Sequence, residues 1–278
     1  MKVDPLRSFT VLLLLTLCGG HMVKAGEELQ RSPLSLQGSV AGGVSLHSAS
    51  FTQLPGVPNC CVEFGSALGW AGDLGVGLEY DTRSRLFENT IKIGVSAGFG
   101  LYGGTLTENE EVGNIIDGNE VTDGIVQHDI ALSSGIVLLS PYVALPVPVL
   151  QSLSLVLGID VGTVLVSNVD QTQSIVEPQD SRYEFLEGGR EKLLYSGSLP
   201  DKASLQSALN VGLRYDLALN DAWTIAPMIR YRWSFTSVMT STEWNVNTLM
   251  AGIQVRYTLP KAEVAPPPPP PPPPVGPP

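Results

Sequence analysis

Two histidines stand beside residues that could assist acid–base chemistry. His47 is followed by Ser48, and His128 is followed by Asp129. An imidazole close to a hydroxyl or a carboxylate can act as a general base. Catalysis requires such groups to converge on one substrate, and these two pairs are far apart in the sequence and belong to no recognised motif. We therefore expect no enzyme activity, with a lipid-modifying enzyme at a membrane rim as the less favoured alternative.

Two further segments carry side chains suited to ligands. Residues 103–124 contain six acids and no base: Glu108, Glu110, Glu111, Asp117, Glu120 and Asp123. Oxygen-rich segments can bind Ca²⁺ or Mg²⁺, but EF-hand spacing is absent, so a solvated acidic loop is favoured, with no metal and no cofactor. A second segment mixes aromatic and basic residues suited to a surface contact: Arg182, Tyr183, Phe185 and Arg190. Neither segment identifies a ligand.

The first 25 residues are typical of a secretory signal peptide. Basic residues precede an apolar run from Phe9 to Leu17, and small residues lie near Ala25. We predict cleavage after Ala25. Lipoprotein processing at Cys18 is the alternative, disfavoured because Leu17 is bulky where a lipoprotein signal has a small residue.

Export determines the charge and the redox setting of the mature chain. Loss of residues 1–25 removes three bases and one acid, which takes the formal net charge from −11 to −13. Such acidity argues against nucleic acid or an anionic membrane surface as a partner. Cys60 and Cys61 remain, in a compartment that permits disulfides. Adjacent cysteines rarely bridge each other without strain, so we expect a local structural or redox feature, with a Cys60–Cys61 disulfide as the alternative.

Eight long segments alternate between apolar residues and small or polar residues, which is the pattern of β-strands. They exceed the roughly 5 to 6 residues of a typical soluble strand. The segments are Leu34–His47, Val62–Tyr80, Ile91–Tyr102, Ile125–Leu145, Leu153–Val166, Leu205–Leu219, Trp223–Phe235 and Asn247–Leu259. One face of each segment is suited to hydrocarbon, and the other is small or charged.

The connections between these segments alternate strictly between short and long. Those at 81–90, 146–152 and 219–223 are short, and those at 48–61, 103–124, 167–204 and 236–246 are mostly long and polar. Outer-membrane barrels have short periplasmic turns and longer external loops. The sequence therefore predicts an all-β fold, an eight-stranded antiparallel transmembrane β-barrel with up-and-down topology. Its first and eighth strands should pair, because an open edge is costly in hydrocarbon. A soluble β-sandwich is the alternative.

Eight strands leave a lumen that side chains can fill. Strand parity predicts a network of charged residues inside: Glu63, Asp73, Glu79, Lys92, Asp129, Asp160, Arg214, Asp216, Arg230, Arg232 and Arg256. Near balance of acids and bases favours a salt-bridged plug over the alternative of a narrow channel. If Arg230 and Arg232 bridge acids across the lumen, replacing both with alanine should increase leakage. Aromatic residues near strand ends are predicted interfacial girdles: Trp70, Tyr80, Tyr142, Trp223, Trp233, Trp244 and Tyr257.

The order of these parts resembles the OmpA-type outer-membrane proteins, in which a signal peptide and an eight-stranded barrel precede a proline-rich hinge. The resemblance is one of architecture and not of residue motifs. The last strand is also similar to the signal read by the barrel-assembly machinery, with Gly252, Val255 and Tyr257 at the expected spacing and Leu259 where an aromatic is usual. The resemblance implies a role in cell-envelope integrity and a peptidoglycan-binding domain that would follow Pro278.

The expected organisation is a signal peptide (1–25), an N-terminal extension (26–33), a barrel (34–259) and a proline-rich linker or tail (260–278). Nine consecutive prolines would extend roughly 28 Å as a stiff polyproline II spacer. We expect the chain to be a piece of a longer protein. The alternative is that a periplasmic partner binds the proline-rich tail itself. The predicted function is structural: a barrel among lipids and lipopolysaccharide in the outer membrane of a Gram-negative bacterium, with loops outside and a periplasmic tether. A channel and a surface adhesin or receptor are alternatives.

Overall fold

The computed structural model describes residues 32–57, 63–86, 89–117, 120–148, 150–180 and 182–260. Several predictions lie outside the described residues: the signal peptide and its cleavage site, most of the N-terminal extension, the pair Cys60 and Cys61, and the proline-rich segment from residue 261. None of the described residues forms a helix long and apolar enough to cross a membrane.

Among the described residues, ten antiparallel strands account for most of the chain. Their bounds are β1 Leu34–Phe51, β2 Phe64–Leu86, β3 Asn89–Asp117, β4 Glu120–Val147, β5 Leu150–Glu177, β6 Glu191–Ser198, β7 Leu205–Tyr215, β8 Leu217–Ala218, β9 Trp223–Ser234 and β10 Glu243–Thr258. All of these strands except β6 and the two-residue β8 form one ring in sequence order. Each of the eight predicted segments overlaps one strand of this ring.

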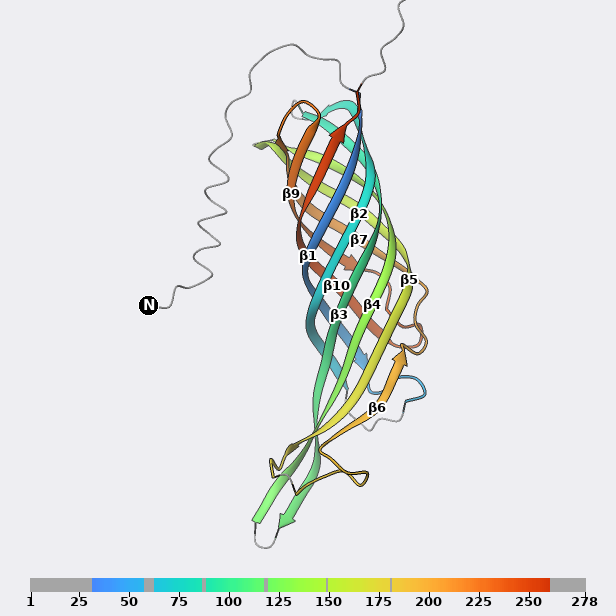
Figure 1. Ribbon diagram of the computed structural model, residues 1–278, viewed down its shortest axis with the longest axis vertical. Helices are drawn as coiled ribbons and strands as arrows, with labels where there is room; N and C mark the ends of the chain where they lie inside the picture. Colours follow the sequence, from blue (N-terminus) through green and yellow to red (C-terminus); the bar gives the residue numbers. More distant parts are fainter. Residues whose placement is uncertain are drawn as a thin grey trace, which may run out of the picture. The chain divides into compact units, whose positions relative to one another are not determined.

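The ring closes through β10, which pairs with β1 on one side and β9 on the other (Figure 1). The β1–β10 ladder runs from Ser35 opposite Thr258 to Ser50 opposite Glu243. Closure gives each strand of the ring a hydrogen-bonded neighbour on both sides, which removes the open edge that hydrocarbon does not tolerate. The predicted fold class, with its first and last strands paired, is confirmed.

Side chains alternate between the outside and the lumen as the sequence predicts. Ile229 and Val255 are 48% and 38% exposed, whereas Gln254 is 6% exposed and Arg230 pairs with Asp73 across the lumen. Large apolar side chains cover the outside of the ring, among them Leu36, Val40, Leu68, Leu74, Val76, Ile93, Leu139, Ile159, Leu213 and Ile253. Soluble proteins rarely expose contiguous apolar area of this extent, so the exterior is suited to hydrocarbon.

Most of the predicted girdle aromatics lie on the exterior. Four are exposed there: Trp70, Tyr80, Trp223 and Trp233. Tyr257 packs against Trp223, with ring centroids 4.8 Å apart. The prediction was wrong for Tyr142 and Trp244, which point into the barrel. An aromatic residue near a strand end faces lipid only where strand parity agrees, and these two occupy inward positions.

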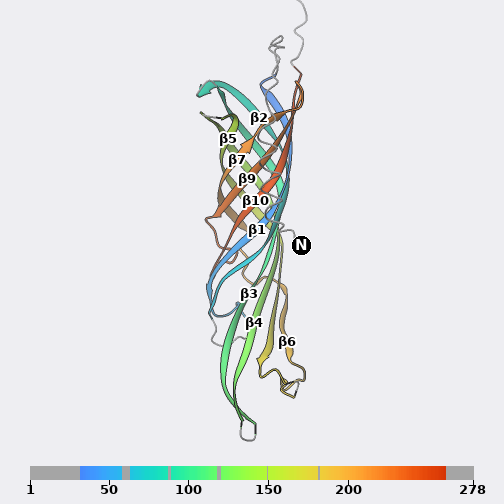
Figure 2. The same cartoon turned by 90° about the vertical axis from the view of Figure 1, so that its left-hand side faces the viewer.

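Two predicted loops are largely strands. β3 and β4 continue as a hairpin through most of 103–124, and β5 continues to Glu177 and pairs with β6 within 167–204. We call this projection the outer wall; it comprises residues 105–117, 120–132, 167–177 and β6. It extends beyond one end of the barrel (Figures 1 and 2). Leu34 and Thr258 lie at the other end, where the β1–β10 ladder starts. The outward side chains of the wall meet water, so its strands lack the alternation of apolar and polar residues that a lipid-facing strand shows. For this reason the sequence predicts loops there.

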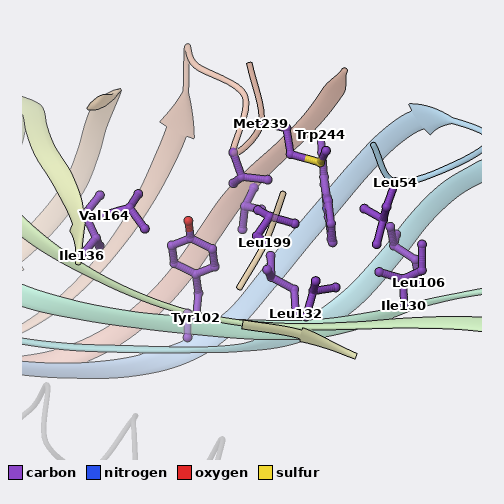
Figure 3. Packing of buried hydrophobic residues seen from close by; sticks show 14 of the residues in the cluster. Leu54, Tyr102, Leu106, Ile130, Leu132, Ile136, Val164, Leu199, Met239 and Trp244 are labelled. Carbon is purple, nitrogen blue, oxygen red and sulfur yellow. The ribbon is translucent and has the colours of Figure 1, made fainter. Parts of the chain in front are cut away.

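An apolar cluster closes the outer end of the lumen (Figure 3). Six of its members come from three connecting segments and from the start of β10: Leu54, Val57, Leu199, Val238, Met239 and Trp244. We call these six residues, each at most 3% exposed, the outer plug. They pack with inward side chains of β3 and β4, including Leu106, Ile130 and Leu132. The sequence pattern did not predict this plug, because long connections were expected to be solvated.

Candidate functional site

Five charged side chains cross the lumen at the end near Leu34. We call them the ion cluster: Glu79, Lys92, Arg214, Asp216 and Arg256. Glu79 Oε2 lies 2.6 Å from Arg214 Nη1, and Glu79 also pairs with Arg256. Asp216 lies 2.5 Å from Arg256 Nη2 and 2.9 Å from Lys92 Nζ. The side chains of Glu79 and Arg214 are 3% and 2% exposed, so each buried charge depends on its partners.

Uncharged side chains complete the hydrogen bonding of the ion cluster. Tyr142 Oη lies 2.8 Å from Glu79 Oε2 and 2.7 Å from Gln37 Oε1. Gln254 donates to Gln37 and accepts from Arg214 at 3.2 Å. The Tyr142 ring crosses the strand at Gly94, where a Cβ would stand 2.3 Å from the ring. Only glycine leaves room for the ring there.

Two more ion pairs lie between the ion cluster and the outer plug. Asp73 pairs with Arg230, and Asp160 Oδ2 lies 3.3 Å from Arg232 Nε. Beside them are two cavities of about 70 and 30 Å³, which share the lining residues Ser39, Ser96, Ser140, Asp160 and Arg230. One water needs roughly 10 to 15 Å³ of such volume, so these cavities fit a few waters and not a wide pore.

Nine of the eleven charged residues predicted inside the lumen take part in these ion pairs. The prediction was wrong for Glu63 and Asp129. Glu63 is exposed and accepts a hydrogen bond from Ser50 Oγ at 3.0 Å. Asp129 lies on the outward face, bonded by Thr107 at 2.6 Å and Gln127 at 2.8 Å. Parity failed for Asp129 because β4 is apolar on both faces, and for Glu63 because regular β1–β2 pairing ends before it.

The predicted pairing of His47 with Ser48 does not form. Ser48 is exposed, whereas His47 is buried on the lumen side. The Trp244 indole N–H donates to His47 Nδ1 at 3.2 Å, which leaves the proton on Nε2, 3.0 Å from Ser45 Oγ. The Ser45 hydroxyl in turn donates to the Gly103 carbonyl at 2.8 Å. The histidine is thus one link in a closed structural chain of hydrogen bonds and has no free nitrogen for a substrate.

The predicted pairing of His128 with Asp129 does not form either. His128 is fully buried on the inward face of the outer wall. Its Nε2 lies 2.9 Å from Glu110 Oε2, and its Nδ1 lies 3.2 Å from Gln173 Nε2. Both ring nitrogens are therefore engaged, and Asp129 points to the opposite face. Within the described parts of the chain, no group of three or more histidine, cysteine or carboxylate side chains could hold a metal ion.

A clamp that the sequence did not reveal orders the connection between β5 and β6. Arg190 donates from Nη1 to the carbonyls of Asp180 (2.5 Å) and Tyr183 (3.3 Å). It donates from Nη2 to those of Ile175 (2.8 Å) and Pro178 (2.7 Å). The sequence predicts a surface contact for Arg190, whereas its guanidinium bonds carbonyl groups of the loop itself.

The clamped loop presents a defined surface to solvent. Gly188 and Gly189 have φ values of 91° and 81°, which favour glycine. Leu186 beside them is fully exposed. Arg182 bonds the Asp180 carboxylate at 2.8 Å, and this hydrogen bond lowers the pKa of Asp180 below its ordinary value.

The residues of the predicted assembly signal lie on β10. Val255 and Tyr257 occupy outward positions. Gly252 occupies an inward position, where a Cβ would stand 2.3 Å from the Val40 carbonyl oxygen. Their spacing is therefore compatible with a strand read from its lipid-facing side.

No protein-family model and no curated protein matches the chain. Matching solved structures include Neisserial surface protein A, at 14% identity and a TM-score of 0.35, covering 82% of this chain and 98% of that one. Ail, the attachment invasion locus protein of Yersinia pestis, matches at 10% identity and 0.26, covering 80% and 98%. The outer membrane protease OmpT of Escherichia coli matches at 8% and 0.27, covering 84% and 99%. With TM-scores this low the likeness carries no argument, and the fold assignment rests on the strand pairing of this chain.

Proposed function

We propose that this chain is an integral outer-membrane protein whose closed barrel anchors a rigid sheet outside the cell. One observation carries the proposal: large apolar side chains cover the outside of the ring, while paired charges line the inside. Water would favour the opposite arrangement, because removal of apolar surface from water drives folding. A bilayer favours this one, because lipid-facing and lumen-facing positions alternate along a spanning strand.

The outer wall is proposed to face the outside, and the opposite end the periplasm. Tyr80, Lys92, Ala144, Leu153, Tyr215 and Trp223 lie next to the short connections, and the strand register places them at the same end of the barrel as Leu34 and Thr258. Short turns are periplasmic in bacterial barrels. The proline-rich segment would then begin in the periplasm, as the OmpA-type resemblance implies, and serve as a tether towards peptidoglycan. Outer-membrane lipids, lipopolysaccharide and the barrel-assembly machinery are the proposed partners.

Cysteine labelling in cells tests this orientation. In a background with Cys60→Ser and Cys61→Ser, Leu186→Cys should react with a membrane-impermeant maleimide in intact cells, because Leu186 is fully exposed on the clamped loop. Asp221→Cys, in the short turn before β9, should react only after the outer membrane is permeabilised. Equal labelling of both positions in intact cells, or of neither, would contradict the proposal.

We further propose a structural protein and not an enzyme. Both histidines considered for acid–base chemistry have their ring nitrogens engaged by other side chains, which supports this assignment. A surface adhesin is the second candidate function. The outer wall and the loop held by Arg190 support it, because an ordered external surface binds a partner without an ordering cost.

A low conductance is expected in planar bilayers. The sequence alone suggested that Arg230→Ala with Arg232→Ala would increase leakage, but the outer plug is a second closure that this double variant leaves intact. We expect its conductance to stay near that of the unmodified protein. Adding Trp244→Ala, which removes the largest plug side chain, should raise conductance. Steady porin-like currents from the unmodified protein, or from the double variant alone, would show that the plug does not close the lumen.

A further inference from the structure

The outermost part of the outer wall is a hairpin with no further strand beside it. β3 pairs with β2 only as far as Gly104, and β2 begins at Phe64. The pairing of β4 with β5 starts only at Ile125. Among the described strands, residues 108–117 of β3 therefore pair only with β4, and residues 120–124 of β4 only with β3. We call these two segments the tip hairpin, which extends past the rest of the wall (Figure 2).

The open edge of β3 can accept another strand. An edge strand presents main-chain N–H and C=O groups that a second extended chain can bond. A two-stranded ribbon is only marginally stable in water, so a third strand would stabilise the tip hairpin. The other edge of the wall, β6, is less suited. It is eight residues long, its register shifts within the strand, and the Tyr195 hydroxyl donates to the Ser198 carbonyl at 2.7 Å.

The charge around this edge is negative. Residues 105–132 contain seven acids, and no lysine or arginine occurs between residues 93 and 181. Glu110 is held by His128 at 2.9 Å. Three other acids have no cationic partner within the described part of the chain: Glu108, Glu111 and Asp123. The edge therefore attracts a cationic partner and repels a second copy of itself.

The unpaired carboxylates lie on both faces of the tip hairpin. Strand parity places Glu111 and Asp123 on the outward face with Asp129. Glu108 lies opposite His128 on the inward face. A strand added beside β3 would point successive side chains to the two faces. Basic side chains at consecutive positions would then meet a carboxylate on each face, and opposite charges on neighbouring strands stabilise a sheet.

We propose that the tip hairpin binds a polybasic peptide segment, which joins the edge of β3 as an extended strand. Main-chain hydrogen bonds would supply affinity, and the carboxylates on the two faces would select consecutive lysine or arginine residues. This inference rests on the proposed role of the outer wall as a binding surface and names the chemistry of the partner.

Fluorescence anisotropy on the whole chain in lipid nanodiscs tests the proposal. Neutral phosphatidylcholine is the lipid, because anionic lipids would themselves attract a cationic probe. The probe is labelled nona-lysine, and its matched control is the same peptide with every backbone N–H methylated, which keeps the charge but cannot donate main-chain hydrogen bonds. Nona-lysine should bind, and the methylated peptide should bind at least about tenfold more weakly. Absence of nona-lysine binding would overturn the proposal, as would equal binding of the two peptides.

A charge variant locates the binding. Glu108→Gln with Glu111→Gln removes one unpaired carboxylate from each face of the tip hairpin and should weaken nona-lysine binding about tenfold. Glu184→Gln with Glu191→Gln removes two exposed carboxylates elsewhere on the outer side and should leave binding nearly unchanged. The heat-modifiable gel band checks that both variants fold. Equal weakening by the two variants would exclude the tip hairpin as the site. Both faces of a nanodisc are accessible, so the result does not depend on the orientation that the cysteine labelling tests.

Discussion

Ile229→Arg is expected to destabilise the inserted barrel by about 2 to 4 kcal/mol, because an arginine on the lipid face near the membrane midplane loses its hydration. Ile229 lies in the middle of β9 and is 48% exposed on the apolar exterior. Val255 faces the same way but lies three residues from the end of β10, so Val255→Arg should cost less. Urea unfolding in lipid vesicles, followed by the heat-modifiable gel band, measures both.

The control for this pair places an arginine on the same outward face but beyond the lipid. Thr107 is outward and exposed on the outer wall, where an arginine would lie beside Asp129 in water. Thr107→Arg should therefore change stability little. Gln254 is a poor control, since it accepts a hydrogen bond from Arg214 and an arginine there would face a like charge. If Thr107→Arg proves as costly as Ile229→Arg, the exterior does not separate lipid from water, and a soluble β-sandwich becomes the better account.

Glu79→Gln should produce the largest loss among lumen substitutions, about 3 to 5 kcal/mol. The change keeps the shape of the side chain but removes the negative charge that pairs with both Arg214 and Arg256. Asp216 then faces both arginines as well as Lys92, so the positive charges outnumber it. Removing one partner of a buried pair leaves an uncompensated charge, and that desolvation cost dominates.

The matched control is Glu187→Gln, which removes the exposed Glu187–Lys192 pair of 2.7 Å. Exposed pairs contribute about 0 to 1 kcal/mol, so the same chemical change should have little effect there. Both variants are compared by equilibrium unfolding in vesicles. Equal effects would mean that water reaches the ion cluster freely and that its pairs do not hold the lumen together.

Strand parity could be read from the sequence wherever one face was apolar and the other polar. β2, β7, β9 and β10 have that pattern, and the charges predicted to point inward from them all take part in ion pairs: Asp73, Glu79, Arg214, Arg230, Arg232 and Arg256. In β4 both faces carry apolar residues, so the same reading placed Asp129 inside and Tyr142 outside, each on the wrong face. Alternation of apolar and polar residues does not reveal the inward face where the side chains on both faces have the same hydropathy.

Neither the outer wall nor the outer plug could be predicted from the sequence, and the two reasons are opposite. The wall is held by main-chain hydrogen bonds between strands whose outward side chains are polar, so its sequence resembles a solvated loop. The plug joins Leu54, Leu199 and Met239, which are isolated apolar residues within polar connections. Such residues become a cluster only when strands distant in the sequence are brought together.

The outer plug links segments near residues 52–57, 199–204 and 236–244, so no single hairpin contains it. These segments meet only when β10 has reached β1 and the ring is complete. We therefore expect plug contacts to form late in folding, after the strands have paired. Contacts that form after the transition state slow unfolding and leave the folding rate almost unchanged. We therefore expect the plug to lower the unfolding rate of the closed ring more than it raises the folding rate.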